Sequence, residues 1–271
     1  MPDVGRGWWG VRMNRDMVLA LFDRQMRQDA RPDNAGALIE RADGVVRQVG
    51  SGEDWNGVLW SDLDEAGADA AIAAQVRRFT AAGREFEWKL YAHDRPVDLP
   101  ARLRAAGFAP EPEETVMVAE VTDVSTAVDL PDGIRLRPVT DAASAKLMAE
   151  VHRSAFGEDR PEIIAGFLAR FAEAPETAAA VVAMAGDVPV SAARMEIYPG
   201  TDFAGLWSGG TVPEWRGRGL YRALVAFRAR LAAERGCRYL QVDASDQSRP
   251  ILLRLGFVPL TTTTPYVYRP R

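Results

Sequence analysis

Cysteine and histidine are scarce in this chain of 271 residues. It has one cysteine, Cys237, and two histidines, His93 and His152. A single cysteine excludes a disulfide bond within the chain and gives no sign of an oxidising compartment. Neither histidine has another histidine or a cysteine at the spacing of metal ligands, so we expect no metal site.

Long apolar runs and an excess of positive charge are also missing. The longest apolar run, Ala178 to Ala185, is too short to cross a bilayer, and residues 1–16 lack the apolar stretch of a signal peptide. The net charge of −5 argues against a dedicated nucleic-acid-binding protein. We therefore expect a cytoplasmic protein with no membrane or nucleic-acid partner. Its oligomeric state, monomer or homodimer, stays open.

The most informative segment is glycine-rich and basic: Arg216-Gly217-Arg218-Gly219-Leu220-Tyr221. It follows an extended apolar run, 206–212, and opens a predicted helix, 220–234, whose apolar residues recur at helical spacing. Glycines let a backbone approach a ligand, and the free N–H groups of a first helical turn attract anions. The segment is therefore either an anion site or an exposed, basic helix start without a ligand.

The surroundings of this segment resemble the GNAT superfamily of acyl-CoA N-acyltransferases. A predicted strand, 239–243, and a short helix ending at Gly256-Phe257 follow it in the order typical of that family. The resemblance implies that the loop amides hold the pyrophosphate of acetyl-CoA, the acyl-donating co-substrate. Arg216 and Gly219 match the family motif, whereas Tyr221 stands where glycine or alanine is usual.

The resemblance spans residues 133–271 and implies which residues contact the coenzyme. Members of the family hold the pantetheine arm and the thioester oxygen with backbone groups of the strand before the loop. The residues implied for coenzyme binding are Gly210, Thr211, Val212, Arg216, Gly217, Arg218, Gly219, Leu220, Tyr221 and Ser245. Gly209-Gly210 in mid-strand is typical of a β-bulge, a close backbone approach or a flexible turn.

Five features of this half recur in the first half in the same order. They are a Leu-Trp-Ser triplet, a helix ending at glycine, a strand, a residue that caps a short helix, and a closing Gly-Phe. In the first half these are Leu59-Trp60-Ser61, Gly83, 85–91, Asp98 and Gly107-Phe108. In the second half they are Leu206-Trp207-Ser208, Gly236, 239–243, Ser248 and Gly256-Phe257. The pattern favours a duplication over chance matches in an unrelated α/β domain. We expect an α/β (α+β) fold of two tandem GNAT-like domains, each a mixed, mostly antiparallel sheet flanked by helices.

The first half lacks the glycine loop. Trp60 and Gly83 are 23 positions apart, whereas Trp207 and Gly236 are 29 apart, and the missing six fall at the loop. In its place stands an acidic stretch, 62–69, whose carboxylates favour a helix start but repel a pyrophosphate. We predict a degenerate domain without a coenzyme loop at residues 1–125 and an acetyltransferase domain at residues 133–271.

Acyl transfer to an amine needs oriented substrates, donors to a developing oxyanion and a path for protons. The family's usual tyrosine acid is replaced here by Leu252, and the possible substitutes are Tyr221, Tyr198 and Tyr266. Glu196 and Asp243 are the candidate bases, because both lie on strands expected to border the cleft. Each could instead be a salt-bridged residue, with water carrying the proton. The candidate catalytic residues are Glu196, Asp243 and Tyr221.

The sequence therefore predicts an acyl-CoA-dependent N-acyltransferase that transfers acetyl from acetyl-CoA to a primary amine of a small molecule. A protein or peptide N-acetyltransferase stays an alternative. So does a non-catalytic acyl-CoA-binding regulatory protein, because of Leu252. We expect the seven tryptophans to fill the core and the contact between domains, although some could line a substrate pocket.

Overall fold

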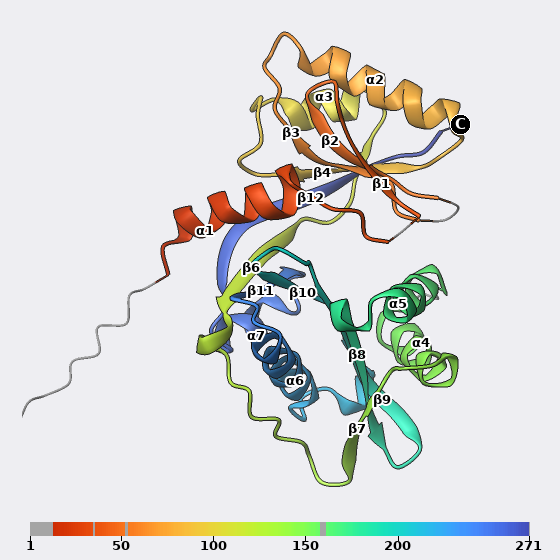
Figure 1. The fold of residues 1–271 in the computed structure, drawn as a ribbon, viewed down its shortest axis with the longest axis vertical. Helices are drawn as coiled ribbons and strands as arrows, with labels where there is room; N and C mark the ends of the chain where they lie inside the picture. The colour runs from red at the N-terminus through yellow and green to blue at the C-terminus, as the bar shows by residue number, and fades with distance from the viewer. Residues whose placement is uncertain (1–12, 35, 52–53, 158–160, 271) are drawn as a thin grey trace, which may run out of the picture.

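The computed structural model describes residues 13–34, 36–51, 54–157 and 161–270, and it shows two lobes joined by one continuous sheet (Figure 1). The helices are α1 Arg15–Phe22, α2 Ala68–Ala81, α3 Leu99–Ala105, α4 Ala142–Phe156, α5 Pro161–Glu173, α6 Leu220–Glu234 and α7 Arg249–Arg254. A π-helical turn, Asp23–Gln28, follows α1, and short 3-10 turns occupy Val121–Asp123, Pro175–Thr177 and Pro213–Trp215. The strands are β1 Leu38–Ala42, β2 Val45–Val49, β3 Gly57–Ser61, β4 Phe86–Tyr91, β5 Ala109–Pro110, β6 Glu114–Glu120, β7 Ile134–Pro138, β8 Ala178–Ala185, β9 Val188–Ile197, β10 Phe203–Thr211, β11 Tyr239–Ala244 and β12 Val258–Tyr268.

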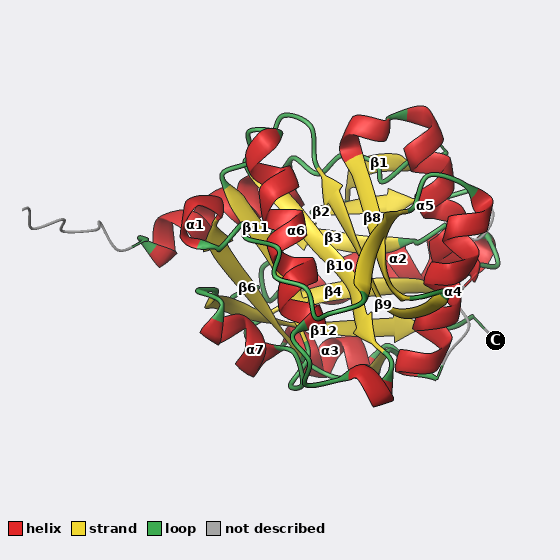
Figure 2. Ribbon diagram, turned by 90° about the horizontal axis from the view of Figure 1, so that it is seen from below, coloured by secondary structure: helices red, strands yellow, loops and turns green. Residues whose placement is uncertain are grey.

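Twelve strands form the sheet, in the order β1-β2-β3-β4-β12-β6-β11-β10-β9-β8-β7, with β5 beside β12. Among the described residues, the pairs β3–β4 and β10–β11 are parallel and the other pairs are antiparallel. Helices cover the sheet on both sides (Figure 2). The predicted fold class, a mixed and mostly antiparallel sheet flanked by helices, is confirmed.

The two halves of the chain repeat one order of elements. β3, α2, β4 and α3 in the first half correspond to β10, α6, β11 and α7 in the second, and each series contains one parallel pair. The glycines that close the last helices, Gly107 and Gly256, have φ values of +97° and +92°. This left-handed conformation is the one expected at a helix end.

The halves exchange their last strands. β6, from the first half, pairs with β11 along six residue pairs. β12, from the second half, pairs with β6 through residues 258–263 and with β4 through residues 263–268. Each half therefore relies on a strand of the other to satisfy its backbone N–H and C=O groups. The domain boundary between residues 125 and 133 stays a prediction, and the sheet is not divided there.

Apolar side chains of the described residues form several cores, three of which matter for the site. The first lobe is built around Trp88, which is buried as expected, and a second core lies under α6 and α7 and includes the buried Leu252. The third core joins the lobes, because Phe22 of α1 packs edge-on against Phe203 of β10. Trp8 and Trp9 lie outside the described residues.

We predict that residues 133–271 do not form a stable domain when produced alone. β11 would lose β6, and β12 would lose β4 and β6, which leaves long unpaired strand edges. Circular dichroism and gel filtration should show an unfolded or aggregated segment, and co-expression with residues 1–125 should restore a folded complex. A monomeric segment with a cooperative unfolding transition would show that the exchange is not required for folding.

Candidate active site

Strands β10 and β11 separate partway along their length. They pair in parallel only through residues 203–205 and 239–241. Beyond this point β10 continues to Thr211 against β9, and β11 continues to Ala244 against β6. The facing edges therefore carry backbone groups without a strand partner, and the gap between them can take an extended ligand.

A β-bulge lies on the β10 side of this gap. The register with β9 shifts between Trp207 and Gly210, and Ser208 has a φ of +52°. A Cβ atom added to Gly210 would lie 2.8 Å from the ring of Phe156 and 3.1 Å from Cβ of Ala155, so β10 passes close to the end of α4 here. The bulge predicted from Gly209-Gly210 is confirmed.

His152 of α4 anchors the bulge. Its Nε2–H donates to the carbonyl oxygen of Ser208 over 3.1 Å. Burial lowers the pKa of His152, so the ring is neutral near pH 7 even though the bond to Ser208 opposes the shift. The sequence suggested only a packing or surface role for this residue, and the structure shows a backbone contact beside the gap.

The glycine-rich loop follows β10 and leads into α6. Gly217 and Gly219 have φ values of +76° and +83°, a conformation that side chains disfavour. Within the described chain, the amide N–H groups of residues 217–222 donate to no backbone or side-chain acceptor. These free donors at the start of a helix form a binding surface for an anion.

The arginines of the loop differ in what their side chains contact. Arg216 folds back, donating from Nε to the carbonyl of Thr211 and from Nη2 to the carbonyl of Ala155, both over 3.1 Å. It thereby fixes the loop to β10 and α4. Arg218 and Arg222 are exposed, and Arg222 lies 3.7 Å from the carboxylate of Asp129, an exposed pair that a phosphate could replace.

Tyr221 turns its ring from the loop toward the bulge. The ring packs on the core under α6, and a Cβ atom added to Gly209 would lie 3.0 Å from its Cε2 atom. The departure from the family motif therefore does not crowd the loop, and Leu220 beside it is buried. Burial raises the pKa of Tyr221, so its hydroxyl keeps its proton at neutral pH.

Arg228 lies under the same bulge without a counter-ion. Its Nε donates to the carbonyl of Leu224 and its Nη1 to the carbonyl of Arg194, while Nη2 would lie 3.7 Å from a Cβ atom on Gly209. No described carboxylate forms an ion pair with it, and burial lowers its pKa to about 10. A buried cation in this state stabilises negative charge that develops nearby.

The other residues implied for coenzyme binding lie around the gap. The N–H of Val212 already donates to the carbonyl of Val190 over 3.0 Å, so it is not free for a ligand. Gly210 and Thr211 lie on the β10 side of the gap. Ser245 is exposed in the turn after β11, where its carbonyl accepts the N–H of Ser248 over 3.1 Å. Because β10 and β11 are parallel, that turn and the glycine loop are at the same end of the sheet.

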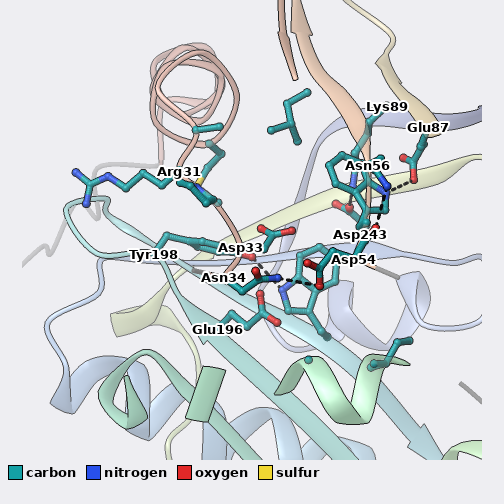
Figure 3. Close-up of a pocket in the computed structure, with 18 of the residues that line it drawn as sticks. Arg31, Asp33, Asn34, Asp54, Asn56, Glu87, Lys89, Glu196, Tyr198 and Asp243 are labelled. Carbon is teal, nitrogen blue, oxygen red and sulfur yellow. Dashed lines mark hydrogen bonds and ion pairs between the residues drawn. The ribbon is translucent and has the colours of Figure 1, made fainter. Parts of the chain in front are cut away.

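A cavity of about 840 Å³ lies between the lobes, and both halves of the chain line it. Its first-half wall comes from residues 25–34, 54–59 and 83–91. Its second-half wall comes from α5, β9, β10 and β11, and it includes Glu196 and Asp243 (Figure 3). The two predicted carboxylates therefore face one open cavity, which starts where β10 and β11 separate.

Both carboxylates are paired with cations. Asp243 binds Nζ of Lys89 across the two halves and also accepts from Nε2 of Gln241 over 2.7 Å. Burial lowers the pKa of Lys89, but Asp243 and other nearby acidic groups outweigh it, so that pKa lies well above its ordinary value. Glu196 binds Arg194 and lies 3.6 Å from Arg170. The salt-bridged state, one of the two alternatives from sequence, is the one observed.

Of the possible substitute acids, Tyr198 and Tyr266 occupy different places. Tyr198 lines the cavity, and its hydroxyl accepts from Nε1 of Trp207 over 3.1 Å. Tyr266 is buried in the core of the first lobe, away from the gap. Leu252, in the position of the family's tyrosine, is fully buried in the core under α6.

In the first half, the corresponding gap is filled by Arg27. β3 and β4 pair only through residues 57–58 and 87–88, and Nε of Arg27 donates to the carbonyl of Leu59 just beyond, over 3.0 Å. The guanidinium carbon lies 3.8 Å from the ring centroid of Tyr91 and 4.6 Å from that of Trp60. The side chain occupies the space that an extended ligand would need.

Two carboxylates hold Arg27 in this position. Asp23 and Asp94 each lie 2.7 Å from its guanidinium, and the arginine is 1% exposed. The acidic stretch adds a second obstacle to a coenzyme, because its carboxylates repel a pyrophosphate. The prediction that it starts a helix is only partly right: α2 begins at Ala68, and residues 62–65 precede it. Both features support the prediction that the first half binds no coenzyme.

The histidines do not assemble a metal site in the described part of the chain. Nε2 of His93 lies 2.8 Å from Asp23 and joins the network around Arg27. No group of three His, Cys, Asp or Glu side chains there is placed to hold a metal ion. Cys237 is half-buried and packs against the core under α6.

This geometry agrees with what comparison with known proteins finds. Residues 145–257 match the acetyltransferase (GNAT) family. The matched segment, less than half of the chain, runs from α4 to the end of α7 and contains the bulge, the glycine loop and the parallel strand pair. None of the curated proteins matches the chain.

Solved structures share the fold over nearly the whole chain. A GCN5-related N-acetyltransferase from Kribbella flavida is 18% identical, with a TM-score of 0.66 and 93% of each chain covered. A functionally unknown conserved protein from Staphylococcus epidermidis is 11% identical, with a TM-score of 0.67 and 94% of this chain and 100% of that chain covered. A tandem GNAT protein from the clavulanic acid biosynthesis pathway is 13% identical, with a TM-score of 0.60 and 94% and 93% covered. At these identities the likeness concerns the fold. In the described residues, no helix has the length and apolarity needed to cross a membrane.

Sequence reasoning missed the first-half residues of the cavity. Asp33 and Asn34 lie in a connection after the π-helical turn and carry no motif. Glu87 and Lys89 could have been found, because they alternate with apolar residues on a predicted strand and so share one face. Arg27 and Arg228 gave no signal, since buried arginines look like surface residues in a helical pattern.

Glu114, at the start of β6, gives this region a specific pH dependence. Burial raises its pKa to about 7, with further contributions from nearby carboxylates and an opposing one from Lys89. An unfolded chain would release the proton near pH 4.5, so the folded state holds a proton that the unfolded state has lost between about pH 4.5 and 7. The stability contributed by this group falls as pH rises through that window.

We predict that Glu114→Gln raises the melting temperature at pH 8 more than at pH 5. The carboxyl group that it removes destabilises the folded state only when it is ionised, which happens above its raised pKa. Thermal unfolding of the full chain at both pH values measures the difference. Glu113→Gln, at the exposed neighbouring position, is the matched control and should show no such contrast. Equal effects of Glu114→Gln at the two pH values would contradict the raised pKa.

Proposed function

We propose that this protein is an acyl-CoA-dependent N-acyltransferase that transfers acetyl from acetyl-CoA to a primary amine of a small molecule by direct attack. The observation that carries the proposal is the gap between β10 and β11. It lies between a loop with free amide groups and a cavity lined by both halves.

The residues around the gap fit the coenzyme. Acetyl-CoA would supply the acyl thioester. The free amides of residues 217–222, with the exposed Arg218 and Arg222, suit its phosphates. The unpaired edge of β10 at Gly210 and Thr211 suits the extended arm that joins phosphate to thioester.

Proton transfer would use groups on both sides of the gap. Glu196 and Asp243 face the cavity and would lead the proton of the attacking amine away, directly or through water. Tyr221, protonated and beside the bulge, would donate to the leaving sulfur. Arg228 beneath it would stabilise the negative charge that develops there.

The shape of the cavity supports a small-molecule acceptor. A volume of about 840 Å³ between two lobes lies within the usual range of roughly 300–1,000 Å³ for small-molecule sites. We further propose that the chain is a tandem protein whose first half has lost its coenzyme slot to Arg27 and now forms the acceptor wall. A protein substrate or a non-catalytic acyl-CoA-binding role is the alternative that the experiments below decide.

We predict one acetyl-CoA bound per chain and a loss of at least tenfold in affinity for Gly219→Val, about 1.4 kcal/mol. Valine at a φ of +83° would distort the loop and place methyl groups beside the free amides. Calorimetry with acetyl-CoA measures affinity and stoichiometry. Gly236→Val is the control, because this glycine has a φ of +73° at the far end of α6. Two sites per chain, or equal effects of both substitutions, would refute the assignment.

We predict release of free thiol from acetyl-CoA by the full chain when a panel of small primary amines is added, and at least a tenfold lower kcat for Tyr221→Phe with unchanged coenzyme affinity. The matched control is Tyr266→Phe, in the core of the first lobe, which should keep its kcat. Coenzyme binding without thiol release for any small amine would refute the small-molecule acceptor, and adding peptide amines to the panel then separates a protein substrate from the non-catalytic role. Full activity of Tyr221→Phe would remove that residue from the mechanism.

A further inference from the structure

Three carboxylates on the first-half wall of the cavity lack a cationic partner. Asp33, Asp54 and Glu87 all line the space, and no Lys, Arg or His side chain within the described residues forms an ion pair with them. Their polar contacts are neutral: Asp33 accepts from Nε2 of Gln48 over 2.9 Å, and Glu87 accepts from Nε1 of Trp55 over 2.9 Å. Figure 3 shows the three carboxylates around the same space as Glu196 and Asp243.

Three of the five cations in the cavity lining are paired with carboxylates of the second half. Lys89 is paired with Asp243, and Arg194 and Arg170 with Glu196. The two remaining arginines of the lining, Arg31 and Arg84, donate to backbone carbonyls of Pro199 and Gly50. Carboxylates outnumber cations in this lining, seven to five, so the cavity has an excess of negative charge to offer a ligand.

The three carboxylates form one connected surface. Asn34, next to Asp33 in the chain, donates from Nδ2 to Asp54 over 3.2 Å, and Trp55 follows Asp54 and reaches Glu87. Asp33 is open to the cavity, yet it lies deep enough that desolvation raises its pKa, and the nearby Glu196 adds to the shift. Desolvation also raises the pKa of Glu87, although the nearby Lys89 opposes the shift. A cation placed among these groups would relieve both effects.

We propose that the acceptor carries a second cationic group, which Asp33, Asp54 and Glu87 bind while the reacting amine lies at the gap between β10 and β11. The substrate class is thus a small diamine or a comparable polycationic amine. This inference rests on the proposed acyl transfer for its reacting end, and on the first-half wall alone for its cationic end. A compact ammonium beside Trp55 also gains from the indole ring.

The test compares two amines of equal length, 1,4-diaminobutane and 4-aminobutan-1-ol, with the full chain and its variants Asp33→Asn and Glu87→Gln. We expect each substitution to raise the KM for the diamine at least tenfold and to change kcat and the values for the amino alcohol less than twofold. Asp187→Asn removes one charge in the exposed β8–β9 hairpin and is the control. Circular dichroism verifies that each variant is folded.

Calorimetry with the diamine, in the absence of acetyl-CoA, separates this inference from the proposed function. Diamine binding that weakens in both variants supports the cationic site, even if no thiol is released. The absence of thiol release would instead overturn the proposed reaction. Thiol release with the amino alcohol as efficient as with the diamine, and unchanged in both variants, would overturn the second cationic group and leave acyl transfer standing.

Discussion

The backbone hydrogen bonds that β6 and β12 make outside their own halves are the constraint on which the rest of the structure depends. Each strand completes the sheet of the other half, so the lobes cannot shift as independent bodies without breaking main-chain pairing. The cavity is therefore built on a continuous sheet with a fixed geometry. Lys89 from β4 and Asp243 from β11 meet across it because the exchanged strands set the spacing between their strands.

Each half has a buried arginine next to the point where its parallel strands separate, but the two arginines differ in whether a carboxylate neutralises them. Arg27 enters the gap of the first half with two carboxylates already bound, so its charge is satisfied and the gap is closed. Arg228 lies under the bulge of the second half, its partners among the described residues are carbonyl oxygens, and burial lowers its pKa. One half has thus become a rigid wall, while the other keeps an unsatisfied positive potential beside an open gap.

Much of the second half could be predicted from sequence because its signals are local. The left-handed glycines, the helix 220–234 and the bulge at Gly209-Gly210 each follow from a few neighbouring residues. The strand exchange could not be predicted, since it depends on pairings between strands more than a hundred residues apart. The acceptor wall was missed for a related reason: Asp33 and Glu87 meet Glu196 only after the lobes have come together. Periodicity shows which face a residue occupies, but not which distant face it will meet.

The place of β12 in the sheet has a consequence for biosynthesis. It is the last strand in the described chain, yet it lies between β4 and β6, two strands made much earlier. While the chain is being translated, β4 and β6 therefore lack their shared neighbour until residues 258–268 have been made. Pairings of such high sequence separation fold slowly, and the exposed edges of β4 and β6 are open to wrong partners meanwhile.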